Sequence, residues 1–291
     1  MKPYEWMAEC TPQTLWIEKK GLLVWLAEVS GALGGGLYLV SLYFNNPGGL
    51  LYGWLIIALG KTSFHFAHLG QPLRFWRLIL KPNRSWLARG VIFMALFLLC
   101  GAGQLLLSHL RPGSTGELLL KVLTGVLAFL VMGYAGFMMN YVRGIPLWSS
   151  GLLPLLFVCG GLAGGLALML LIGLSGQDVQ AKTILAGLRW LLCINTLLIT
   201  TYLWSAAYAS PTAEQSVKEL TQGRAAFWLW LGVFVCGLII PLGISLYDAV
   251  AGVTPPAMLA LAAAGVLAGV FSLNYCLLKG ACYGPLLPQA P

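Results

Sequence analysis

The residues best placed to do chemistry in this sequence are ionisable side chains that interrupt apolar segments. Lys61, His65 and His68 lie at positions i, i+4 and i+7, which puts them on one stripe of a helix. Glu28 lies about two turns into the apolar segment before them. An ionisable residue inside a membrane span costs roughly 2.5–3.5 kcal/mol on insertion scales, so it should face other helices. We predict that Lys61, His65 and Glu28 relay protons; a structural ion pair and a satisfied core histidine are the alternatives.

The composition places these residues in a membrane. Of the 291 residues, 59% are hydrophobic and 9% are charged, whereas a soluble domain carries about 25% charged residues. The mean hydropathy is +0.83. The formal net charge is +8, but the positive residues lie in loops beside apolar segments. Membrane lipids and a docked protein are therefore the expected partners, and nucleic acid is not.

Eight apolar segments are long enough to cross a bilayer as helices, which need about 20 residues each. Turn residues separate the segments, which are 21–44, 50–67, 87–108, 117–140, 149–173, 183–208, 225–248 and 256–278. A bilayer accepts only helices or closed barrels, and runs of this length are helices. We therefore predict an all-α membrane protein with eight transmembrane helices in two four-helix bundles. The long polar connector from Ser210 to Arg224 is expected to carry an interfacial helix.

These segments divide the chain into four predicted parts. Residues 1–20 form an N-terminal cytoplasmic or interfacial segment, 21–145 a first four-helix bundle, 146–278 a second, and 279–291 a C-terminal tail. Most loop lysines and arginines fall on the side of the N-terminus, so the positive-inside rule places both termini in the cytoplasm. A loop basic enough to dock an acidic partner would mislead that rule.

The sequence predicts no haem or metal in this chain. Its seven cysteines are scattered without a C-x-x-C pair, so neither a zinc site nor an iron–sulfur cluster can be built locally. Haem held between helices needs histidines on two of them. The one such pairing joins His109 with His65 or His68, and these lie at opposite ends of their helices.

Two stretches resemble a known family. The loop from His68 to Gly90, HLGQPLRFWRLILKPNRSWLARG, resembles the signature loop of the NrfD/PsrC family. The stretch from Tyr134 to Phe157, with RGIPLW at 143–148, resembles that family's run from the fourth helix into the fifth. Members are membrane subunits of polysulfide, dimethyl sulfoxide, sulfite and related molybdopterin oxidoreductases, and of some cytochrome-linked complexes. Eight helices in a chain of this length also fit the family.

The resemblance implies a quinone-reactive subunit, not catalytic alone, in the cytoplasmic (inner) membrane of a prokaryote. Such a subunit binds menaquinone or ubiquinone and exchanges two electrons and two protons with a four-cluster, ferredoxin-like iron–sulfur subunit. That partner serves a molybdopterin or related catalytic subunit. By its place in the motifs, His68 would act in quinol oxidation and Tyr134 would lie at the quinone head group.

Residue chemistry agrees with this interpretation. Histidine and tyrosine can each donate and accept a hydrogen bond, which suits the two carbonyl oxygens of a quinone. Arg74 and Arg89 are the alternative candidates for stabilising a developing quinol anion, and Glu28 is a candidate for contacting the head group. The basic residues that we expect to face the docked partner or lipid phosphate are Arg74, Arg77, Lys81 and Arg84.

Two positions depart from the family pattern. Dimethyl sulfoxide reductase-type members carry a glutamate where this chain has Gly90, and polysulfide reductase relatives place a histidine in the first helix, where this chain has none. Glu28 is our hypothesis for a replacement. The alternatives to quinone chemistry are a proton-translocating subunit of a respiratory complex, a secondary transporter, and a purely structural anchor.

Overall fold

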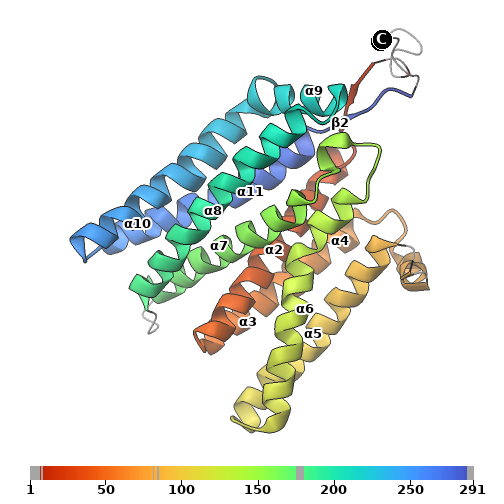
Figure 1. Cartoon of the computed structure of the whole chain (residues 1–291). Helices are drawn as coiled ribbons and strands as arrows, with labels where there is room; N and C mark the ends of the chain where they lie inside the picture. The colour runs from red at the N-terminus through yellow and green to blue at the C-terminus, as the bar shows by residue number, and fades with distance from the viewer. Residues whose placement is uncertain (1–6, 8, 81, 84, 175–179, 287–291) are drawn as a thin grey trace.

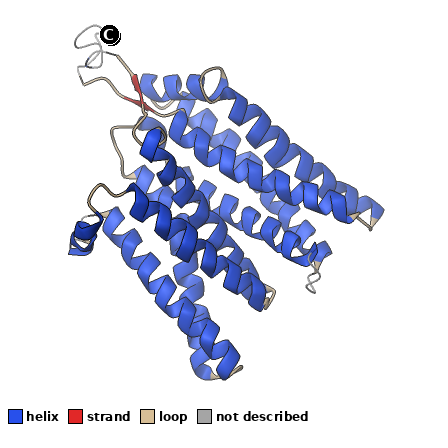
Figure 2. Cartoon of the chain, turned by 180° about the vertical axis from the view of Figure 1, so that it is seen from behind, coloured by secondary structure: helices blue, strands red, loops and turns tan. Residues whose placement is uncertain are grey.

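The computed structural model describes residues 7, 9–80, 82–83, 85–174 and 180–286, and most of them are helical (Figures 1 and 2). Eight helices in this part of the chain are long and apolar enough to span a membrane. They confirm the predicted all-α membrane protein, and each corresponds to one predicted segment. The spans are Lys19–Tyr43, Pro47–His68, Trp86–Leu110, Thr115–Asn140, Leu152–Leu174, Ala181–Ala207, Trp228–Ala251 and Pro256–Lys279.

Some spans are built from more than one helical element. The first joins the 3-10 helix η1 (Lys19–Gly21) to α2 (Leu22–Tyr43). The second joins α3 (Pro47–Leu55), the π-helix η2 (Ile56–Lys61) and α4 (Thr62–His68), and the seventh joins the π-helix η5 (Trp228–Ile239) to α10 (Ile240–Ala251). The remaining spans are α5 (Trp86–Leu110), α6 (Thr115–Asn140), α7 (Leu152–Leu174), α8 (Ala181–Ala207) and α11 (Pro256–Lys279).

Short elements lie between the spans and at the ends of the chain. They are β1 (Thr11–Pro12), the 3-10 helices η3 (Pro72–Leu80) and η4 (Pro146–Trp148), α9 (Pro211–Thr221) and β2 (Cys282–Tyr283). A helix does therefore form in the polar connector, as predicted. Local sequence explains where several helices begin, because a side-chain oxygen accepts a hydrogen bond from an orphan backbone N–H. The N-caps that do so are Asn46, Ser85, Ser114 and Ser210.

The first four spans and the last four lie in two groups, with α2 and α7 in contact between them (Figure 1). Within the first group, α2 also contacts α3 and α6. One cluster of buried side chains runs across both groups; it includes Leu37 of α2, Ala135 of α6 and Ala167 of α7. The proposed domain limits at residues 145 and 146 stay a prediction.

The two ends of the described chain meet at one end of the helices, which we call the strand end. There β1 pairs antiparallel with β2, and Thr11 lies opposite Tyr283. The side-chain Nε2 of Gln13 donates to the carbonyl oxygen of Leu278 at 2.7 Å. The segment before α2 is thereby held against the end of α11. The final residues of α4 and α6 point toward this same end (Figure 1).

Candidate functional site

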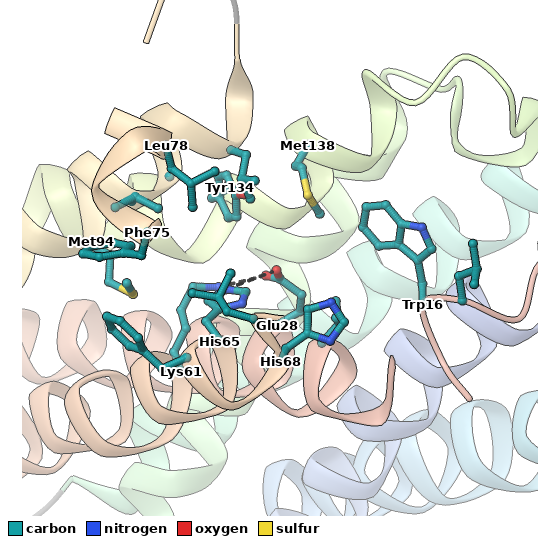
Figure 3. A pocket seen from close by; sticks show the side chains of 17 residues that line it. Trp16, Glu28, Lys61, His65, His68, Phe75, Leu78, Met94, Tyr134 and Met138 are labelled. Carbon is teal, nitrogen blue, oxygen red and sulfur yellow. Dashed lines mark hydrogen bonds and ion pairs between the residues drawn. The ribbon is translucent and has the colours of Figure 1, made fainter. Parts of the chain in front are cut away.

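A cavity of about 510 Å³ lies between the first-group helices at the strand end (Figure 3). Glu28 of α2, Lys61 of η2, His65 and His68 of α4, and Tyr134 of α6 all line it. The structure thus brings together five of the residues that the sequence singled out. Apolar side chains complete the wall, and they include Leu15, Phe66, Phe75, Leu78, Leu87, Val91, Met94 and Met138.

A buried ion pair lies on one side of the cavity. Lys61 Nζ is 2.8 Å from Glu28 Oε2, and both residues are almost fully buried, at 2% and 4% exposed. The other carboxylate oxygen, Oε1, has no hydrogen-bond partner among the described residues, and His65 Nε2 is 3.7 Å from it. Gly31 makes room for this arrangement, because a Cβ there would lie 2.8 Å from Lys61 Nζ. The pair therefore leaves one acceptor free beside a histidine.

The π-helix η2 sets the direction of Lys61. A π-turn closes with i→i+5 hydrogen bonds, so it rotates the residues after it relative to a straight α-helix. Lys61 is the last residue of η2, and His65 and His68 follow on the α-helix α4. His65 and His68 therefore share one face of α4, but Lys61 lies on the π-helix before it, so no single straight α-helix carries all three residues of the i, i+4, i+7 stripe. Sequence periodicity gave no signal for that turn.

Tyr134 crosses from α6 to the ion pair. Its ring centroid is 5.3 Å from Lys61 Nζ, and the side chain is buried. Gly90 of α5 lies directly behind the ring: a Cβ at this position would overlap the Cε2 atom of Tyr134. The departure at position 90 therefore has a steric reason in this structure, since Gly90 leaves the space that the Tyr134 ring occupies.

His68 lies nearer the water-facing edge of the cavity. Its Nδ1 is 3.0 Å from the backbone carbonyl oxygen of Lys20. A carbonyl can only accept, so Nδ1 carries the proton and Nε2 of the neutral ring is left as an acceptor. Lys20 follows Lys19, which has the unusual φ of 51° for a residue other than glycine. The turn at the start of α2 therefore sets the tautomer of His68.

Arg89 does not join the cavity. Its Nε donates to the carbonyl oxygen of Pro82 at 2.9 Å and its Nη2 to that of Asn83 at 3.1 Å. The guanidinium also lies over the Trp86 ring, 4.7 Å from its centroid. Arg89 thus fastens the loop before α5, and its position gives no support to the expected contact with a quinone head group.

The structure describes two of the four residues that we expected at a docking surface. Arg74 and Arg77 lie exposed on η3, while Lys81 and Arg84 fall outside the described residues. For the metal expectation, the described residues contain no cluster of three or more histidine, cysteine, aspartate or glutamate side chains that could hold an ion. The expected lack of haem and metal stays a prediction.

Sequence reasoning missed two contributors to the cavity wall. Leu15 and Trp16 come from the segment before the first span, and Phe75 and Leu78 come from η3. Figure 3 shows Phe75 and Leu78 across the cavity from Lys61 and His65. The short apolar run that contains Leu15 and Trp16 was the one signal available for the first contributor. A threefold spacing of apolar residues was the signal for the second.

The comparisons with known proteins identify the family. The family model described as polysulphide reductase, NrfD, matches residues 48–283. The chain belongs to the NrfD family. This membership confirms the resemblance seen in the two motifs, and with the eight spans it makes the chain a multi-pass integral membrane protein of a family of oxidoreductase membrane subunits.

Three curated relatives show how far this NrfD protein has diverged. It is 30% identical to the C subunit of the polysulfide reductase of Wolinella succinogenes, over 79% of its own length and 80% of the relative. It is 26% identical to Protein NrfD of Escherichia coli (strain K12), over 80% and 79% of the two proteins. It is 23% identical to the Protein NrfD homolog of Haemophilus influenzae, over 67% and 68%.

Proposed function

We propose that this chain is the quinone-reactive membrane subunit of an oxidoreductase. In this proposal the cavity holds the head group of a membrane quinone, menaquinone or ubiquinone. The bound quinone supplies two-electron, two-proton chemistry, and the electrons pass between it and a docked four-cluster iron–sulfur subunit. That partner in turn serves a molybdopterin or related catalytic subunit. The names of the NrfD relatives support the redox setting.

One observation carries the proposal: an apolar cavity at one end of a helix bundle holds a free carboxylate oxygen, two histidines and a tyrosine on its wall. Its volume of about 510 Å³ falls in the usual range of roughly 300–1,000 Å³ for small-molecule sites. Quinone chemistry requires hydrogen-bond partners that exchange protons and an apolar space for the tail, and the cavity offers both.

The residues take different parts. Tyr134 donates a hydrogen bond from its hydroxyl at the buried side, and His68 Nε2 accepts a proton at the edge nearest water. Glu28 Oε1 is the one carboxylate oxygen on the wall without a hydrogen-bond partner among the described residues, so it is the acceptor for a buried proton. His65 lies next to it at 3.7 Å and passes that proton outward. Lys61 Nζ donates a hydrogen bond to the other carboxylate oxygen, Oε2, at 2.8 Å and so fixes the position of the Glu28 side chain.

The partner subunit, in this proposal, docks at the strand end over the first helix group. In the part of the chain that the structure describes, Lys19, Lys20 and Arg143 have no carboxylate within ion-pair distance. The cations of the second group at the same end are neutralised: Lys218 by Glu214, Arg224 by Glu219, and Lys279 by Glu18. An acidic surface is therefore attracted to the side nearest the cavity.

Matched substitutions in the purified complex, reconstituted in nanodiscs, test the proposal. Tyr134→Phe and His68→Ala each remove a group that transfers or donates a proton, so quinone-linked electron transfer should fall by about 10²-fold or more. Tyr38→Phe and His109→Ala serve as controls, because neither residue lines the cavity. Electron transfer from an artificial donor to the iron–sulfur partner should stay unchanged in all four variants.

Other outcomes favour the alternatives. Unchanged quinone-linked rates in both site variants, with the complex intact, would support a purely structural anchor. A ratio of transported protons to electrons above the scalar value for quinone would support a proton-translocating subunit. Loss of the iron–sulfur partner from a site variant would show a role in assembly instead.

A further inference from the structure

The segment η3, between the second and third spans, has three distinct faces. A 3-10 helix has three residues per turn, so residues three apart lie directly above one another. The nine residues of η3 therefore form three stripes: Pro72, Phe75 and Leu78; Leu73, Trp76 and Ile79; and Arg74, Arg77 and Leu80. Each stripe has its own chemistry.

The first stripe faces the protein. Phe75 and Leu78 are the two half-buried residues of η3, and both line the cavity. The Phe75 ring lies 5.0 Å from the Phe66 ring of α4. This stripe forms part of the cavity wall and fixes how η3 is turned about its own axis.

The second stripe exposes large apolar side chains. Leu73 is 92% exposed, Trp76 54% and Ile79 39%. Three such side chains in a row would be unfavourable in water, because each leaves apolar surface unburied. The third stripe presents Arg74 and Arg77 beside them, and the Arg77 guanidinium lies 5.5 Å from the Trp76 ring centroid.

The position of η3 decides what meets these two stripes. It begins four residues after α4 ends at His68 and ends six residues before α5 begins at Trp86. Figures 1 and 2 show it beside the helices at the strand end, outside α5 and not over the tops of the spans. A short segment at the ends of two spans and at the outer edge lies where the bilayer surface must be.

We propose that η3 is a membrane-interface anchor whose partner is the lipid surface itself. Leu73, Trp76 and Ile79 enter the boundary between head groups and acyl chains, as apolar faces of interfacial helices do. Arg74 and Arg77 contact lipid phosphates, where each basic residue contributes about 1 kcal/mol on an anionic membrane. These two arginines are thereby assigned to lipid in place of a docked protein. The inference stands independently of quinone binding.

Spin labels at single cysteines test the stripes in nanodiscs, in a Cys193→Ser background because Cys193 is the exposed native thiol among the described residues. Leu73→Cys, Trp76→Cys and Ile79→Cys should show frequent collisions with oxygen, which partitions into lipid, and few with a water-soluble nickel chelate. Arg74→Cys and Arg77→Cys should show the reverse. Leu99→Cys, on an exposed face in the middle of α5, calibrates the lipid environment, and Tyr141→Cys calibrates the aqueous one.

Two outcomes would overturn the proposal. If labels at 73, 76 and 79 meet the nickel chelate as readily as the Tyr141→Cys label, η3 stands in water. If they become protected from both reagents only when the partner subunits are present, the stripe is a protein-docking surface.

Discussion

The first four spans surround a cavity of about 510 Å³, whereas the last four enclose a space of about 30 Å³ in their core. In the second group, glycines let helices close on one another: a Cβ at Gly237 of η5 would lie 2.5 Å from the Cα of Gly269 in α11. In the first group, the end of α4 and the start of α5 border the cavity, which ionisable and apolar side chains line. Incomplete contact between helices therefore leaves a site in the first group, and close contact makes the second group a packed support.

The difference extends to charge. The first group has an ion pair with both side chains buried inside the protein, Glu28 with Lys61, while the second group has its ion pairs at the strand end and partly exposed. A buried pair is expensive to break because the remaining charge is stranded, but an exposed pair contributes little. We expect substitutions in the two groups to differ in kind as well as in size.

The largest expected effect is on the ion pair of the first group. Glu28→Gln or Lys61→Met alone strands a buried charge and should lower the free energy of unfolding by roughly 3–5 kcal/mol. The double variant should recover much of that loss, because neither charge remains. Thermal unfolding in nanodiscs measures both. The Glu214–Lys218 pair of the second group, whose side chains are both exposed, is the control, and equal losses from Glu214→Gln and Glu28→Gln would contradict the contrast.

The next effect tests whether turnover depends on the position of the Tyr134 hydroxyl. Gly90→Ala places a methyl group where the Tyr134 ring lies, so the hydroxyl must move, and a displacement of about 1 Å can lower turnover by 10²-fold. Gly101→Ala, on the same helix, meets the ring of Trp54, which does not line the cavity, and should keep its turnover. Quinone-linked electron transfer is the measurement.

A Tyr134→Ala background sharpens this prediction. Without the ring there is nothing for the methyl group at position 90 to displace, so Gly90→Ala should cause no further loss of turnover there. A full additional loss in this background would show that Gly90 acts by another route.

A smaller effect tests the closure of the second group. Gly237→Ala forces η5 away from α11 and should lower stability by about 1–3 kcal/mol, with little change in turnover per folded protein. Gly243→Ala is the matched control, since a Cβ there meets nothing within 4 Å. Circular dichroism melts and activity assays on the same samples provide the comparison. Loss of turnover without loss of stability would place functional residues in the second group.

The smallest effect concerns a link between the termini. The hydrogen bond from Lys279, at 2.9 Å, holds the pKa of Glu18 below its ordinary value. A lowered carboxyl pKa means stability that is present above the unfolded-state pKa of about 4.3 and is lost as pH falls through the folded value. The melting temperature of wild type should exceed that of Glu18→Gln slightly at pH 7, and the difference should vanish in acid. A difference that persists in acid would contradict the assignment.

Hydrophobic patterning by itself determined the eight spans, because runs of apolar residues of this length have one stable state in a bilayer. Spacing likewise placed Lys61, His65 and His68 on one stripe, and two motifs indicated the family. These are local properties, readable along the chain. The sequence also offered an ion pair between Glu28 and Lys61 as an alternative to a proton relay, and it identified Tyr134 as a candidate without showing that Tyr134 would meet Lys61.

Tertiary structure decided which of these residues meet and what surrounds them. Glu28 and Lys61 pair because α2 packs beside η2. Tyr134 of α6 reaches them because Gly90, on the preceding span α5, leaves room for its ring. Arg89 stays outside the cavity because its guanidinium donates hydrogen bonds to the carbonyl oxygens of Pro82 and Asn83. Hydrophobic periodicity does not distinguish among these possible partners. Contacts between segments distant in sequence do, because shape and unsatisfied hydrogen bonds select which residues meet.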